Sequence, residues 1–144
     1  MSYHTKTCLL FHCVFATRNR IASIPEELQP RLWAYMGGIA RTNNMKALAV
    51  GGIADHSHIL LSLPPTIAIA KATQLVKAGS SKWMHKQTGS RRFEWQEGYG
   101  AFTIGASQVS ATIRYIENQP RHHRKTSVSE EWEMFLRRHA VFMD

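Results

Sequence analysis

The sequence predicts an α+β fold of the split βαβ, ferredoxin-like type, with an antiparallel sheet that carries its helices on one face. Strand-like and helical patterns follow one another in the order β-α-β-β-α-β, and Gly, Pro and Asn pairs separate them. The chain has 144 residues, close to the usual size of one domain. We therefore expect a single domain over residues 1–144, whose other sheet face is free for a ligand, a nucleic acid or a second subunit.

The first half of the chain supplies three strands and one helix. Residues 7–17 are rich in Leu, Val and Phe and predict a buried strand. A helical turn precedes a main helix over residues 30–42, because proline begins helices and breaks their interiors. Strands over 46–50 and 56–63 follow, separated by a Gly-Gly pair. The side chains of the helix that we expect to face the core are Leu32, Tyr35, Met36 and Ile39.

The second half supplies the remaining elements. A helical pattern covers residues 66–87, with a possible division at a Gly-Ser-Ser sequence. Residues 99–105 predict the fourth strand, and residues 108–119 a helix that Pro120 ends or kinks. A last helix reaches about residue 139, and Ser127 has the capping-box spacing to Glu130 at its start. We expect these C-terminal helices to follow the sheet unit.

Charge and composition narrow the function. Eighteen Lys and Arg oppose ten Asp and Glu, which gives a net charge of +8. A polyanionic partner is the first hypothesis, and a generally basic surface is the alternative. Two cysteines form no disulfide framework and favour a reduced, cytoplasmic compartment. No apolar run is long enough for a membrane span. The sequence also has no GxxxxGK[ST] phosphate-binding loop, so it gives no sign of a nucleotide cofactor.

Two pairs of residues carry possible chemistry. His56 and His58 are two apart on a predicted strand, so both imidazoles face one side and can reach one divalent ion. Asp55 is adjacent, and strand alternation places it on the opposite side. Tyr115 and Gln119 are four apart on a predicted helix, where a Gln oxygen can bind Mg²⁺ or Mn²⁺ and a phenol can act as nucleophile. The alternatives are unrelated surface histidines, a packed tyrosine and a surface glutamine.

Basic and aromatic side chains suggest a path for nucleic acid. Trp83, Trp95 and Tyr99 either stack on unpaired bases or belong to the core. The basic candidates for DNA binding are Arg18, Arg20, Lys77, Lys82, Arg91, Arg92, Arg114, Arg121, Arg124 and Lys125. For the last four, the alternative is a solvated helix end, because cations are favourable near a helix C-terminus.

Five segments together resemble one family. They are residues 11–20, 51–58 (GGIADHSH), 80–83, 95–102 and 115–119 (YIENQ). Their order and spacing are similar to those of the HUH-type single-tyrosine transposases, which include small insertion-sequence and REP-associated members. The resemblance covers about residues 7–140.

The resemblance implies a role for each matched residue. His56, His58 and Gln119 would be ligands of Mg²⁺ or Mn²⁺, and Tyr115 would be the nucleophile. The enzyme would nick and rejoin single-stranded DNA at hairpin-bearing element ends through a 5′-phosphotyrosine intermediate. The family also implies a homodimer whose tyrosine helix serves the partner's metal site. Ser57 departs from the bulky apolar residue that usually separates the histidines, and alternation points it away from the metal.

Other classes of function remain open at this point. One is a non-catalytic nucleic-acid-binding module that uses a ferredoxin-like sheet. Another is a related HUH nuclease of replication initiation or conjugation, and a third is a domesticated endonuclease that no longer mobilises its own gene. A covalent protein–DNA product separates the enzymes from the binding module.

Overall fold

A computed structural model describes residues 4–139, and it confirms the predicted α+β class. Four strands form one antiparallel sheet in the order β2-β3-β1-β4. This order places β1 and β3 in the middle, where both neighbours satisfy their backbone hydrogen bonds. The strands are β1 (Leu10–Ala16), β2 (Lys46–Ile53), β3 (His56–Ser62) and β4 (Gly100–Thr103).

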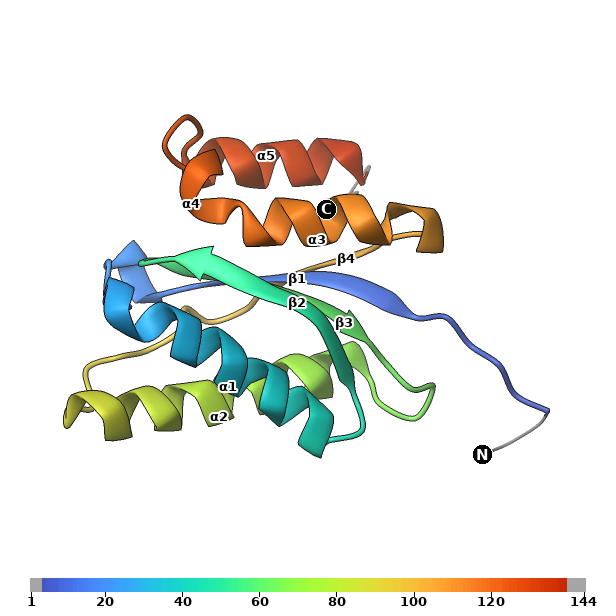
Figure 1. Ribbon diagram of the computed structural model, residues 1–144, viewed down its shortest axis with the longest axis horizontal. Coiled ribbons are helices and arrows are strands. Elements are labelled where there is room, and N and C mark those ends of the chain that lie inside the picture. The colour runs from blue at the N-terminus through green and yellow to red at the C-terminus, as the bar shows by residue number, and fades with distance from the viewer. Residues whose placement is uncertain (1–3, 140–144) are drawn as a thin grey trace.

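Helices cover both faces of the sheet (Figure 1). One layer holds α1 (Gln29–Thr42) and α2 (Ile69–Thr88), as the split βαβ arrangement predicts. The opposite layer holds α3 (Val109–Glu117), α4 (Gln119–His122) and α5 (Val128–Arg138). The expectation of a free second face was therefore wrong, because the C-terminal helices fold back over it.

The sheet separates a large apolar cluster under α1 and α2 from two smaller ones on the α3–α5 side. On β3, Ile59 and Leu61 join the core under α1 and α2, whereas Leu60 packs against Ile116 of α3. This alternation follows from the two-residue repeat of a strand. It assigns His56 and His58 to the α3–α5 side, with Leu60. None of the helices within residues 4–139 is long and apolar enough to cross a membrane.

The Gly-Gly pair lies inside β2 rather than after it. A Cβ at Gly51 would lie 2.4 Å from the backbone oxygen of Ile116, so the missing side chain lets α3 approach the sheet. Gly52 has φ +153, which side chains rarely adopt, next to the turn into β3. Gly51 therefore sets how closely α3 approaches the sheet, and the strand continues to Ile53.

Three helix predictions needed correction. The second helix runs without a break through Gly79, and the Ser80 hydroxyl after it donates to the Val76 carbonyl of the preceding turn. The tyrosine helix ends at Glu117, and Gln119 begins α4 with Pro120 in its first turn, where proline is tolerated. Tyr35 is 43% exposed rather than inward. The predicted cap of the last helix is confirmed, with Ser127 bonded to the N–H of Glu130.

The described helical segments also include three short 3-10 turns, which are η1 (Arg18–Arg20), η2 (Glu26–Leu28) and η3 (Ala106–Gln108). The first follows β1 and carries two predicted DNA-binding arginines, of which Arg20 donates to the Ser129 hydroxyl of α5.

Candidate active site

The two strand histidines lie side by side beneath the C-terminal helices. His56 and His58 are fully buried, and their ring centroids are 5.1 Å apart. Ser57 between them points to the other face, where its hydroxyl donates to the Gly51 carbonyl. The predicted alternation of these three residues is confirmed.

Each of these imidazoles is held from behind by a second side chain. His56 Nδ1 lies 2.9 Å from Asp55 Oδ1, and His58 Nδ1 lies 2.8 Å from His12 Nε2. The expectation that Asp55 faces away was wrong, because Asp55 sits in the turn between β2 and β3, where strand alternation does not apply. The hydrogen bond with His56 lowers the pKa of Asp55 below its ordinary value. Both Nε2 atoms are thereby directed toward the site's interior.

Oxygen atoms from α4 and α5 meet those nitrogens. His56 Nε2 lies 3.0 Å from Gln119 Oε1, and His58 Nε2 lies 3.1 Å from Glu131 Oε1. His123 Nε2 reaches the other Glu131 oxygen at 3.2 Å. One ligand atom from each of His56, His58, His123 and Glu131 can be chosen so that all lie within 4.8 Å of one another.

These donors fit a divalent metal. His56 faces an oxygen from each ring nitrogen, but a neutral imidazole carries one N–H and satisfies one of them. A cation between His56 Nε2 and the Gln119 oxygen would remove this mismatch. The carboxylate behind the imidazole, from Asp55, is the usual partner that orients a metal-binding histidine. The residues can therefore hold a divalent metal.

Tyr115 reaches the same centre from α3. Its half-buried hydroxyl donates to Glu131 Oε2 and lies 3.3 Å from His122 Nε2. Its ring meets His58 edge-on at 5.7 Å between centroids. Burial and then the neighbouring Glu131 carboxylate raise the pKa of Tyr115 above its ordinary value, so the resting tyrosine is a neutral phenol. The four residues predicted from sequence thus meet around one carboxylate.

Burial and hydrogen bonding set the charges of the centre. Burial lowers the pKa of His58 to about 4 and that of His12 to about 3, so both are neutral at pH 7. Burial alone would raise the pKa of Glu131, but hydrogen bonds from His123 and His58 outweigh it and hold the carboxyl ionised. The pKa of His123 is raised because its bond to that carboxylate outweighs its burial. A negative carboxylate therefore lies beside the neutral imidazole of His58.

Glu131 and His123 were missed by reasoning from sequence. Glu131 follows the capping residue Glu130, and its inward position depends on how α5 returns over the sheet. Its neighbour Trp132 packs elsewhere, against Phe102 of β4, and is 37% exposed. The one signal in the sequence was the His122-His123 pair, three and four residues after Gln119, which places further possible metal ligands close to it.

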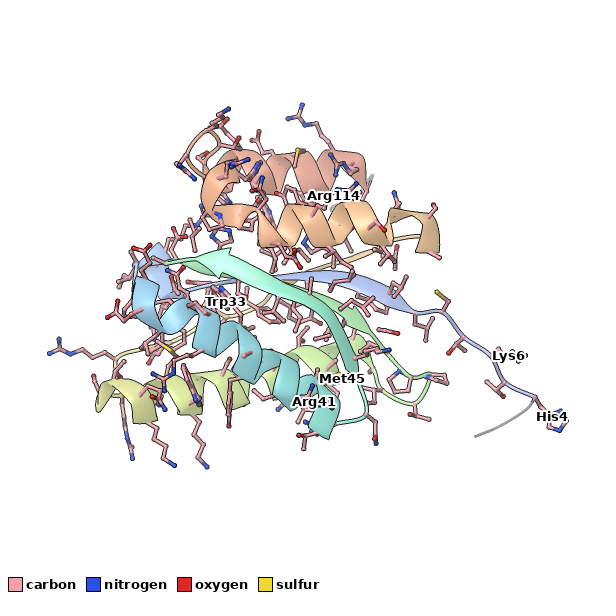
Figure 2. The ribbon with its side chains drawn as sticks, in the orientation of Figure 1. His4, Lys6, Trp33, Arg41, Met45 and Arg114 are labelled. Carbon is pink, nitrogen blue, oxygen red and sulfur yellow. The ribbon has the colours of Figure 1, made fainter. Side chains whose placement is uncertain are left out.

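The predicted basic residues are spread over both helical layers. Lys82 lies on α2, and Arg91 and Arg92 lie in the loop after it. Lys77 donates to the carbonyls of Gln96 and Gly98, and Arg18 pairs with Glu94. Four more are exposed on α3, on α4 and in the turn before α5, close to Tyr115: Arg114 (labelled in Figure 2), Arg121, Arg124 and Lys125.

The aromatic candidates have different positions. Trp95 is part of the core and donates to Ser80, and Trp83 stacks on Tyr35 at 5.5 Å between centroids. Tyr99 is 39% exposed and stays a candidate for stacking.

The fold thus sets a buried histidine pair on a central strand of a split βαβ sheet, with a tyrosine on a helix above it. The sequence matches the family described as "Transposase IS200 like" over residues 5–119, and the chain belongs to this family. The matched segment ends at Gln119, so His123 and Glu131 lie beyond it.

Relatives agree with this assignment. The transposases for insertion sequence element IS200 of Salmonella typhimurium and Salmonella typhi are each 28% identical over 123 residues, 81% of this chain and 80% of theirs. A putative transposase from Deinococcus radiodurans R1 is 24% identical, with a TM-score of 0.65 over 83% of this chain and 96% of that one. A REP-associated tyrosine transposase bound to a REP hairpin is 16% identical, with a TM-score of 0.60 over 85% and 74%. At these identities, the two structures show the fold alone.

Proposed function

We propose that this transposase is an HUH-type single-tyrosine enzyme that nicks and rejoins single-stranded DNA through a 5′-phosphotyrosine intermediate. The observation that carries the proposal is the contact of the Tyr115 hydroxyl with Glu131, the carboxylate that also bonds His58. A packed structural tyrosine would not need to share a buried carboxylate with two imidazoles. A nucleophile beside a metal would lie with its hydroxyl on a carboxylate that the imidazole ligands share.

His56, His58 and Gln119 are the proposed ligands of Mg²⁺ or Mn²⁺, with His123 and Glu131 close enough to add donors. When bound, the metal would neutralise charge on the oxygens of the scissile phosphate. Asp55 and His12 are positioning residues, because each fixes the ring of one proposed ligand from behind.

The protein residues account for the proton. As the Tyr115 oxygen bonds to phosphorus, its proton passes to Glu131 Oε2, the oxygen to which it already donates. The bond from phosphorus to the 3′ oxygen breaks, and that oxygen takes up a proton to become a 3′-OH. Rejoining reverses these steps with a second 3′-OH. One phosphodiester replaces another at each stage, so no nucleotide cofactor is required.

The proposed substrate is DNA folded into hairpins at the ends of an element, acted on in the cytoplasm. The net charge of +8 and the exposed cations around Tyr115 support a polyanionic strand that enters from the α3–α4 side. The REP-associated relative, which was solved with a REP hairpin, shares the fold and supports this choice of substrate.

The tyrosine lies over the histidines of its own chain. Because Tyr115 contacts His58 and Glu131 within one chain, we propose that cleavage can occur in cis. The homodimer with an exchanged tyrosine stays a prediction of the family resemblance. Mixing Tyr115→Phe with a His56→Ala/His58→Ala variant separates the two arrangements, because activity returns in the mixture if the tyrosine acts in trans.

A labelled single-stranded hairpin, incubated with the protein and Mn²⁺ and run on a denaturing gel, tests the proposed function. We expect a covalent protein–DNA band that disappears with EDTA, with Tyr115→Phe and with His56→Ala/His58→Ala. Tyr35→Phe, on α1 in the opposite layer, is the control that keeps the band. A band that survives Tyr115→Phe refutes the nucleophile, and bound DNA without an adduct under any metal supports the binding module. An adduct does not distinguish a mobile element from a domesticated endonuclease; the presence of paired palindromes in the flanking DNA does.

A further inference from the structure

We infer that a hollow beside His56 binds one unpaired base of the DNA strand, next to the scissile phosphate. The inference rests on the proposed function and adds a specificity-determining site to it. The hollow has a volume of about 560 Å³ and lies between the end of β1, the loop before β4 and the start of α5. This volume is within the range of small-ligand pockets.

Two aromatic side chains give the hollow its stacking surfaces. Tyr99 and Trp132 both line it, and they are 39% and 37% exposed. They are two of the four large hydrophobic side chains that are exposed within residues 4–139. Base faces stack on aromatic rings whatever the sequence, so exposed rings beside a DNA-cleaving centre suit a base.

The fold keeps space for Trp132. A Cβ at Gly100 would lie 2.7 Å from Trp132 Cζ3, so only a glycine at this point of β4 admits the indole. The indole also meets the Phe102 ring, with centroids 6.0 Å apart. Trp132 therefore packs against the sheet and still exposes part of its ring to solvent. This fixed position suits a stacking surface, whereas an aromatic side chain with no role could extend freely into solvent.

The remaining wall offers hydrogen bonds with little net charge. Arg20 and Glu97 both line the hollow, and their opposite charges cancel. A lining without net charge suits a neutral base better than a phosphate. Gln96 lines it too, and its Oε1 accepts from the backbone N–H of Asn19. Asn19 and Arg20 have φ values of 56° and 55°, a backbone conformation that costs energy and that often marks functional sites.

The position of the hollow identifies its occupant. His56, a proposed metal ligand, is part of the lining, so the hollow and the metal centre share a wall. A strand whose phosphate is held at His56 and Tyr115 can place an adjacent base there. A base within a duplex is stacked and paired and cannot enter, so the site selects an unpaired or extruded base.

The test uses two fluorescent DNA hairpins that differ only in their single-stranded tails, one of thymidines and one of abasic residues. Fluorescence anisotropy with the Tyr115→Phe chain measures each Kd without covalent trapping. We expect the abasic tails to bind about fivefold or more weakly. Trp132→Ala and Tyr99→Ala should weaken binding of the thymidine tails by a similar factor and leave the abasic hairpin unchanged.

Tyr35→Ala is the matched control, because Tyr35 is an equally exposed aromatic on the opposite layer. It should leave both affinities unchanged. If the protein with an unchanged pocket binds both hairpins with equal affinity, the inference is overturned. This comparison needs no pocket variant, so a folding defect of Trp132→Ala cannot obscure the result. In that case an adduct in the denaturing-gel assay still upholds the proposed function. Absence of both DNA binding and adduct refutes the function and the inference together.

Discussion

The substitution Gly51→Ala tests whether the close approach of α3 to the sheet builds the active site. Gly51 pairs with His58 across the β2–β3 ladder, and its missing side chain faces Ile116 of α3. Ile116 is the neighbour of Tyr115 on α3, so displacement of α3 moves the predicted nucleophile and shifts the start of α4, where Gln119 lies.

The magnitude follows from the contact distance. A Cβ at position 51 would lie 2.4 Å from the Ile116 oxygen, whereas ordinary contacts begin at 3.4 Å, so one backbone must move by about 1 Å. Overpacking of this kind costs about 1–3 kcal/mol in the free energy of unfolding. A shift of about 1 Å in a reacting group can lower the rate about a hundredfold.

Urea denaturation and the rate of adduct formation measure the two effects. Gly37→Ala is the control, because its added Cβ would meet the Ala47 side chain at an ordinary contact distance of 3.9 Å. Gly37 lies in the interior of α1, where alanine stabilises a helix by about 0.5–1 kcal/mol relative to glycine. We expect Gly51→Ala to lose both stability and rate. If Gly51→Ala matches Gly37→Ala in both measurements, the reasoning about α3 is refuted.

Three further predictions concern the centre itself. Glu131→Gln keeps the side-chain shape but removes the proton acceptor, so the rate of adduct formation should fall by about 10²–10⁴ with the fold intact by circular dichroism; an unchanged rate contradicts the assignment. Asp55→Asn should weaken Mn²⁺ binding by about 10–100-fold in calorimetry, because it loosens the ring of His56, whereas Glu94→Gln should not. His12 and His58 have pKa values lowered from 6.5 to about 3 and about 4, so the unfolded chain binds their protons first as the pH falls. Each histidine therefore contributes its full stabilisation above pH 6.5. When the pH falls from 8 to 5, the free energy of unfolding measured by urea denaturation should decrease by about 2 kcal/mol per histidine. A free energy of unfolding that does not change over that range contradicts the burial of neutral imidazoles.

The parts of the site that are local in sequence were predictable. His56 and His58 share a face because a strand repeats every two residues, and this holds in any sheet. Tyr115 and Gln119 come together although a helix break separates them. Asn118 at the break has φ −98° and ψ 15°, and the Gln119 amide still donates to the Tyr115 carbonyl one turn back. The prediction of the pair therefore survived an incorrect helix boundary.

The parts that depend on tertiary contacts were not predictable from pattern. Asp55 turns back toward His56 because it lies in a hairpin turn, to which the alternation rule does not extend. Glu131 enters the centre because α5 reverses direction and covers the sheet, and amphipathic spacing does not say which surface a helix will cover. The same reversal covers the face that was expected to be free.

Mass spectrometry of the protein–DNA adduct tests the central claim most directly. The protein is incubated with a single-stranded hairpin and Mn²⁺, digested with protease and nuclease, and fragmented to locate the attached nucleotide. We expect a 5′-phosphate linked to the hydroxyl of Tyr115. A nucleotide on any other residue, or cleaved DNA with no protein adduct, would contradict it.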